Sequence, residues 1–138
     1  VRALDEGYDH VQGSRFVPGG QAINTPWIRL IALRMVHAPL ISLGARYWYS
    51  DTTNGFRAYS DNLLRDSRVA VFRDVFVGYE LHYYLAIRAC RLGFRIIEVP
   101  VTRAYPKHGP IPTKISPFRG NLGILTTLLK AVTHQYNP

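Results

Sequence analysis

The feature that most constrains the fold is a helical segment that runs through one glycine into a β-branched segment. Residues 79–92 (YELHYYLAIRACRL) place apolar side chains at helical spacing, and Gly93 follows as a C-terminal cap. Residues 94–101 (FRIIEVPV) are rich in β-branched side chains, which favours a strand. Because a helix and a strand in this order bury their apolar faces against each other, the pattern predicts a layered α/β fold.

Turn and cap residues mark the other expected elements. Pro18, Gly19 and Gly20 indicate a loop over 16–23, and Thr25 followed by Pro26 predicts the start of a helix capped by Thr25. The remaining expected elements are the end of a helix over 1–8, a strand over 8–14, an extended piece over 56–59, a short helix from Ser60 to about Asp66, a loop over 102–115 and a helix from Ser116-Pro117 to about His134.

The expected helix over 26–38 is amphipathic and basic. Arg29 and Arg34 interrupt its apolar positions, and Pro39 predicts a kink or an end near Ala38. Two interpretations stay open: a core helix with one solvated side, which we favour, or a helix that lies on a membrane surface. With the arginines and His37 in the way, no uninterrupted apolar stretch reaches the roughly 18–20 residues of a membrane span.

Composition excludes several classes of protein and favours anionic partners. A hydrophobic fraction of 47% with only 19% charged residues excludes a disordered tail, and a single cysteine, Cys90, excludes a disulfide framework or a Cys-based zinc site. The net charge is +8, and only Lys107, Lys114 and Lys130 of the 17 cations are lysines. Since arginine suits planar contacts with phosphate, this balance indicates a phosphate-bearing partner, unless it reflects a general arginine bias.

Three segments carry groups suited to chemistry. Gly13-Ser14-Arg15 would bring backbone N–H groups and a cation to the end of a strand. In residues 51–59 (DTTNGFRAY), Asp51 is a general base, a partner for Arg57 or a turn cap, and local reasoning favours the cap. Glu80 falls in the first turn of a helix, where the helix dipole alone favours a carboxylate.

In this order and spacing, the segments resemble the C-terminal half of family 2 glycosyltransferases. The likeness is to the dolichol-phosphate mannose synthase group and related polyprenyl-phosphate glycosyltransferases. It covers residues 9 to about 101 well and 102–130 more loosely. The resemblance implies a GT-A fold, an α/β sandwich around a mostly parallel sheet, of which residues 1–138 would form a partial domain on the acceptor side.

The resemblance also implies a reaction. Such enzymes move a sugar from a nucleotide-diphosphate sugar to a polyprenyl phosphate with inversion, at the cytoplasmic face of a membrane, and they use Mg²⁺ or Mn²⁺. The Asp-x-Asp metal motif and the nucleotide-binding segment lie upstream of the Gly-Ser-Arg segment in the family, and this sequence has neither. We therefore expect no metal ligands here and no activity from these residues alone.

Carried over residue by residue, the resemblance implies a site. Asp51 would be the catalytic aspartate, while Arg15 and Arg29 would meet phosphates of donor or acceptor. Arg57 would hold the loop of Asp51, and Glu80 would lie beside the acceptor. Lys114 resembles a lysine of a Gly-x-Ser-Lys segment, but it follows Gly109 by five residues, where the family has three.

Two alternative functions are weighed. One keeps the fold and changes the acceptor to a glycan hydroxyl, which would need a true base. Processive synthesis is disfavoured because no Gln-x-x-Arg-Trp segment is present. The other is a basic module that binds nucleic acid or other anions. It has only the net charge in its favour, so we expect no nucleic-acid partner.

Overall fold

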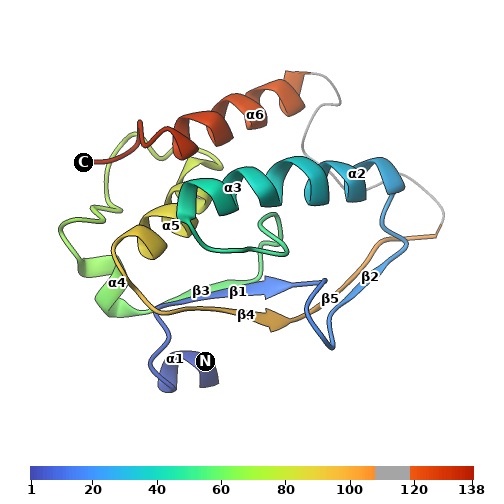
Figure 1. Cartoon of the computed structure of the whole chain (residues 1–138), viewed down its shortest axis with the longest axis horizontal. Helices are drawn as coiled ribbons and strands as arrows, with labels where there is room; N and C mark the ends of the chain where they lie inside the picture. Colours follow the sequence, from blue (N-terminus) through green and yellow to red (C-terminus); the bar gives the residue numbers. More distant parts are fainter. Residues whose placement is uncertain (108–118) are drawn as a thin grey trace.

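The computed structural model describes residues 1–107 and 119–138 and shows helices packed on one face of a small mixed sheet (Figure 1). The helices α3 (Ala38–Ala45), α5 (Glu80–Arg91) and α6 (Arg119–Val132) contact one another above the sheet. The short α1 (Arg2–Asp5) lies below it. The predicted α/β architecture is confirmed in this respect.

A buried central strand organises the sheet. β1 (His10–Ser14) pairs antiparallel with β3 (Arg57–Tyr59) and parallel with β4 (Ile96–Pro100), and all five of its residues are buried. β2 (Gln21–Ile23) and β5 (Thr102–Ala104) form a separate parallel pair. Among the described residues the central sheet is therefore mixed, with one parallel and one antiparallel pairing, and is not the mostly parallel sheet that the resemblance implies.

One helical segment continues where the sequence predicts a break. α2 (Trp27–Ala32) passes into a π-helical turn, η1 (Leu33–His37), and then into α3, so the predicted end near Ala38 is wrong, and the α-helical pattern is instead altered by a π-turn directly before Ala38. The N–H of Ala38 bonds to the carbonyl oxygen of Leu33, the wider spacing of a π-turn. Pro39, which has no N–H, falls in the first turn of α3, where that group is not needed.

The cap predicted for this helix is also wrong. Pro26, not Thr25, precedes the first helical residue, and the Thr25 hydroxyl is buried without a hydrogen-bond partner. The outer side of the helix carries exposed apolar residues: Trp27, Ile28, Ile31, Met35 and Leu43. By length and composition the 19 residues Trp27–Ala45 could cross a membrane, although 33% of their most apolar window is buried against the rest of the chain.

The core consists of two apolar clusters that share α5. One cluster joins α3, α5 and α6 around the fully buried Ile41, Tyr49 and Leu128. The other joins α5 to α4 (Asp61–Arg65) and the loop after it, around Leu63 and Val69. Since both clusters rest on α5, this helix fixes the layer of helices on the sheet.

The remaining elements follow the sequence closely, with two exceptions. Ser60 caps α4, with its hydroxyl accepting from the N–H of Leu63, and Gly93 ends α5 with a φ of 82°. The strands β2 and β5 fall in segments expected to be loops. Each has three residues, all of them exposed, so neither carries the alternation of apolar and polar side chains that marks a half-buried strand. The helix start predicted at Ser116-Pro117 lies outside the described residues.

Candidate anion site beside a buried ion pair

A buried ion pair joins the end of the central strand to the loop that precedes β3. Arg15 follows β1, and its Nε and Nη2 atoms donate to Oδ2 and Oδ1 of Asp51 at 2.6 and 2.9 Å. The backbone N–H of Arg15 adds a bond of 3.2 Å to the same carboxylate. Only 3% of the Arg15 side chain and none of the Asp51 side chain are exposed. Two parallel bonds in a buried setting make this a strong and specific contact.

Hydrogen bonds from nearby residues of the same segment stabilise the loop of Asp51. The N–H of Thr53 donates to Oδ1 of Asp51 at 3.3 Å, which is the turn cap that local reasoning favours. Arg57 donates from Nη2 to the carbonyl oxygen of Thr52 at 2.5 Å, so it contacts the loop of Asp51. The alternative in which Asp51 pairs with Arg57 is wrong, since the carboxylate of Asp51 is occupied by Arg15.

Glu98 supports this loop from β4, and sequence reasoning missed it. Its carboxylate accepts from the N–H groups of Ser50, at 3.0 and 3.1 Å, and of Asp51, at 3.1 Å. Burial raises the pKa of Glu98 above its ordinary value, and the nearby charge of Asp51 acts in the same direction. An acidic residue within a β-branched strand is the sequence signal that could have identified it.

Three further arginines lie against two aromatic rings beside the pair. The guanidinium carbons of Arg29 and Arg103 lie 5.5 and 5.3 Å from the centre of the Tyr105 ring. That of Arg34 lies 4.9 Å from the centre of the Phe16 ring. Among the side chains that the structure describes, none of this arginine trio forms an ion pair with a carboxylate. Positive charge without a counter-charge is an arrangement suited to an anionic ligand.

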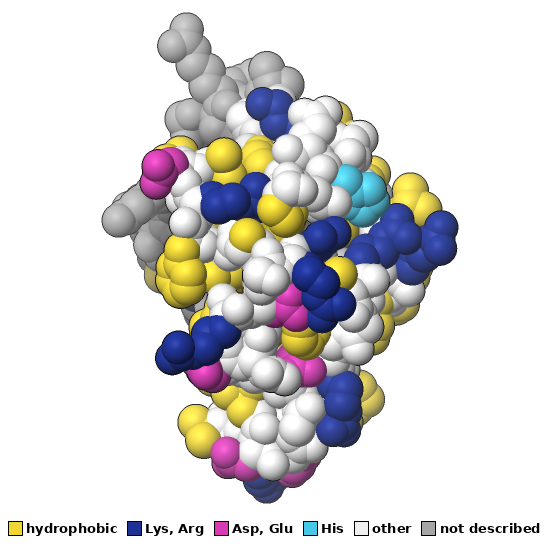
Figure 2. Space-filling model, turned by 90° about the vertical axis from the view of Figure 1, so that its left-hand side faces the viewer, with side chains coloured by type: hydrophobic (Ala, Val, Ile, Leu, Met, Phe, Trp, Pro, Cys, Tyr) yellow, Lys and Arg dark blue, Asp and Glu magenta, His cyan; other side chains and the backbone are white. Residues whose placement is uncertain are grey.

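Most arginines elsewhere in the described chain bond to acceptors of their own. Figure 2 shows Lys and Arg side chains spread over one face among apolar and acidic side chains. For example, two arginines bond to carboxylates, Arg65 to Asp61 and Arg68 to Asp66. Three others bond to backbone carbonyl oxygens: Arg73 to that of Ala70, Arg88 to that of Arg68 and Arg91 to that of Gly44. The arginine trio differs from this group in its acceptors: no backbone carbonyl oxygen or carboxylate of the described residues is bonded to a guanidinium of the trio, whose one such bond is from Arg29 to the phenolic oxygen of Tyr105.

The structure does not bring every predicted site residue to this place. Glu80 lies at the start of α5, where its carboxylate accepts from the N–H of Gly78 at 2.6 Å. Lys114 lies outside the described residues. The involvement of Arg34 and Arg103 was not predicted from sequence, because their nearness to Arg15 depends on the π-turn and on β5.

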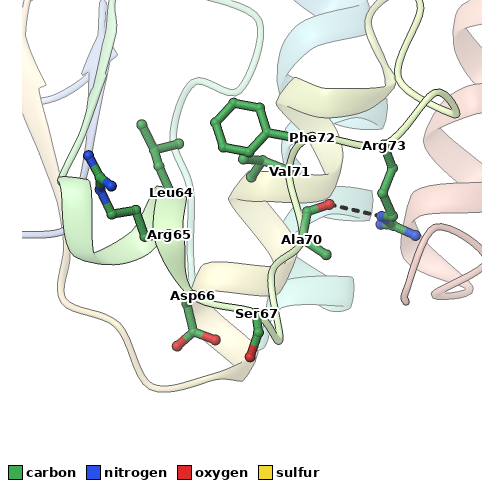
Figure 3. Close-up of a pocket in the computed structure, with 8 residues that line it drawn as sticks. All are labelled: Leu64, Arg65, Asp66, Ser67, Ala70, Val71, Phe72 and Arg73. Carbon is green, nitrogen blue, oxygen red and sulfur yellow. Dashed lines mark hydrogen bonds between the residues drawn. The ribbon is translucent and has the colours of Figure 1, made fainter.

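Among the described residues, neither a cluster of metal-binding side chains nor the surface hollow beside α4 coincides with this site. Within the described residues, no group of three or more His, Cys, Asp or Glu side chains is arranged to hold a metal ion. A hollow of about 430 Å³ lies beside α4 (Figure 3). It is lined by Leu64, Arg65, Asp66, Ser67, Ala70, Val71, Phe72 and Arg73, none of which is a predicted site residue.

Comparison with known proteins supports one class of enzyme. No family model and no solved structure matches the chain. The polyprenol monophosphomannose synthase of Mycolicibacterium smegmatis is 35% identical over 103 residues, and the undecaprenyl-phosphate mannosyltransferase of Micrococcus luteus is 39% identical over 95 residues. These matches cover 72% and 68% of this chain but 37% of each relative. The resemblance to polyprenyl-phosphate glycosyltransferases that the motifs indicate is thereby confirmed: over about 70% of its length, this chain is similar to polyprenyl-phosphate mannosyltransferases.

Proposed function

We propose that this chain is the acceptor-side part of a glycosyltransferase that moves a sugar from a nucleotide-diphosphate sugar to a polyprenyl phosphate. The sugar that we expect is mannose. The observation that carries the proposal is the similarity to two enzymes whose names specify polyprenyl-phosphate mannosyl transfer. The arginine trio supports it independently, because a phosphate is an anion that guanidinium groups bind well.

The GT-A fold and the partial domain belong to the same proposal. The chain spans about 37% of the length of the two relatives, and the motifs of its sequence are those expected of the acceptor side. In the complete enzyme, the nucleotide and Mg²⁺ or Mn²⁺ would be held by residues outside the matched part, where the metal would offset charge on the departing diphosphate. The 138-residue chain is accordingly expected to bind acceptor without transferring sugar.

The chemistry fits a phosphate acceptor better than a hydroxyl acceptor. An oxygen of the lipid phosphate attacks the anomeric carbon, the bond from that carbon to the nucleotide diphosphate breaks, and the configuration inverts. The attacking phosphate is already an anion, so no base has to remove a proton. This agrees with the state of Asp51, whose carboxylate is buried and occupied by Arg15 and would act by positioning.

The helical segment from α2 to α3 would lie at the cytoplasmic face of the membrane. Trp27, Ile31 and Met35 are exposed on it, and Arg29 and Arg34 are on the same helical segment. Apolar residues that enter the lipid boundary, together with arginines that meet anionic headgroups, are the features of an interfacial helix. A lipid phosphate held at such a surface would reach the arginine trio without leaving the membrane.

A chimera tests this function with a complete catalytic domain. The 103 aligned residues of the M. smegmatis polyprenol monophosphomannose synthase are replaced by the matching residues of this chain. We expect the purified chimera to transfer mannose from its nucleotide diphosphate to a polyprenyl phosphate, and the Arg29→Gln variant of the chimera to transfer at a lower rate. A folded chimera that transfers mannose to a glycan hydroxyl, or to no acceptor at all, would refute the proposal.

A further inference from the structure

Tyr105 occupies a fixed position next to the arginine trio. It directly follows β5 and is 8% exposed. Its N–H donates to the carbonyl oxygen of Ile23 at 3.0 Å, and its own carbonyl oxygen accepts from Nδ2 of Asn24 at 3.1 Å. Two bonds to the end of β2 hold the backbone, so the ring is held as part of the β2–β5 pair.

The phenol contacts two arginines from different elements. Nη1 of Arg29, on α2, donates to the phenolic oxygen at 3.1 Å, and the guanidinium carbons of Arg29 and Arg103 lie 5.5 and 5.3 Å from the ring centre. A guanidinium over an aromatic face is stabilised by the charge distribution of the ring. Tyr105 therefore holds Arg29 and Arg103 beside a single ring.

Within the described residues, the phenolic hydrogen of Tyr105 has no acceptor. In the bond with Arg29 the phenolic oxygen accepts, and a phenol can still donate its O–H. No described residue accepts a hydrogen bond from this O–H. A buried ring whose one donor lies among positive charges can give that hydrogen to an oxygen of an anion.

The charges around Tyr105 also affect its ionisation. Burial alone would raise the pKa of Tyr105, but the hydrogen bond from Arg29 and the charges of Arg29, Arg103 and Arg15 outweigh it, and the pKa is lowered from its ordinary value. A place that stabilises negative charge on the phenolic oxygen would stabilise negative charge on a phosphate oxygen by the same interactions.

We infer that Tyr105 is a positioning residue and hydrogen-bond donor of the phosphate site, where it holds Arg29 and Arg103 for the anion and donates its O–H to a phosphate oxygen. The inference rests on the proposed function, in that it assumes the arginine trio to be the place where phosphate binds. It adds a residue that the motifs do not include. The shared chemistry is a phosphate oxyanion, and it could come from the lipid acceptor or from the donor diphosphate.

The test compares Tyr105→Phe with a matched variant, Tyr79→Phe, which removes the hydroxyl of a half-exposed tyrosine directly before α5. Calorimetric titration of the chain uses inorganic phosphate, farnesyl phosphate and guanosine diphosphate as probes. For each probe that the wild type binds, we expect Tyr105→Phe to lower the affinity by roughly tenfold, which corresponds to about 1.4 kcal/mol. Tyr79→Phe should bind as the wild type does.

A spectroscopic measurement distinguishes positioning from a general effect on folding. Because a bound phosphate neutralises the neighbouring arginines, it should raise the pKa of Tyr105, and the near-ultraviolet absorbance of phenolate should then appear at higher pH. The Tyr105→Phe variant should lose this phosphate-dependent change. If that variant fails to fold, the titration of the wild type alone still tests the inference.

Each outcome has a separate meaning. Stronger binding of farnesyl phosphate than of guanosine diphosphate assigns the site to the lipid acceptor, and the reverse assigns it to the donor. If the wild type binds phosphate, Arg29→Gln weakens the binding and Tyr105→Phe does not, the inference on Tyr105 is overturned and the proposed function stands. If no probe binds to the folded wild type, the phosphate site fails, and the inference fails with it.

Discussion

The guanidinium carbons of Arg15 and Arg34 lie 5.3 and 4.9 Å from the centre of the same Phe16 ring, but the two residues differ in burial and in pairing. Arg15 is buried and donates two parallel bonds to Asp51, whereas Arg34 is exposed and pairs with no carboxylate among the described side chains. Charge alone therefore does not identify a ligand site. A paired arginine is committed to the fold, and an unpaired one is available to an anion.

The largest expected effect comes from breaking the buried pair. Asp51→Ala would leave the Arg15 guanidinium buried without a counter-charge, and we expect the free energy of unfolding to fall by about 3–5 kcal/mol in a urea titration. Asp61→Ala is the matched control, because it breaks the exposed pair with Arg65 and should leave stability unchanged within error. Equal losses from the two variants would show that the Arg15–Asp51 pair is not the structural element described here.

A second prediction concerns the buried His10 at the start of β1, at the opposite end of that strand from Arg15. Burial, and then the charge of Arg57, lower the pKa of His10 to about 3, so the ring is neutral in the folded chain over most of the acidic range. An unfolded histidine binds its proton near pH 6.5, so the contribution to stability is fully present above that pH and is lost as the pH falls toward 3.

The loss should approach about 1.4 kcal/mol per pH unit in urea titrations between these two values. His10→Gln, which cannot take up a proton, should flatten the profile. His134→Gln serves as the control, since that ring is less buried than His10, and should flatten it less. An unchanged profile in His10→Gln would mean that His10 is not the group that sets acid sensitivity.

A smaller effect, on membrane binding, is expected from changing an arginine of the trio. Arg29→Glu should leave the fold intact and weaken binding to vesicles of anionic lipid by roughly tenfold, since each basic residue near such a surface contributes about 1 kcal/mol. Arg65→Glu makes the same change of charge away from the arginine trio and should bind nearly as the wild type does. Unchanged binding by Arg29→Glu in a flotation assay would exclude the helix of Arg29 from the membrane surface.

Local sequence patterns predicted those helices, strands and caps that are determined by residues close together in the chain. The helix that ends at Gly93, the strand after it and the cap at Ser60 depend on neighbouring residues, and each is confirmed. The continuity of the helix past Pro39 could not be predicted, because it depends on a π-turn that places the proline where its missing N–H is not needed.

The candidate site was predicted only where a motif contains the residue. Asp51 and Arg15 were identified by their motifs, but their pairing joins positions 36 residues apart and depends on the antiparallel pairing of β1 with β3, which the loop of Asp51 precedes. Arg103 lies in, and Tyr105 directly after, a three-residue exposed strand that has no periodicity to predict it. The roles of Glu80 and Lys114 stay predictions.

The central claim is that the arginine trio binds the phosphate of a polyprenyl lipid. The most direct measurement is flotation of the chain with neutral vesicles that contain either undecaprenyl phosphate or undecaprenol. It is made for the wild type, for Arg29→Gln with Arg103→Gln, and for Arg65→Gln with Arg68→Gln. We expect the wild type and the second double variant to float with the phosphate vesicles, and the first double variant to lose most of this binding. Equal flotation with undecaprenol vesicles, or equal binding by both double variants, would contradict it.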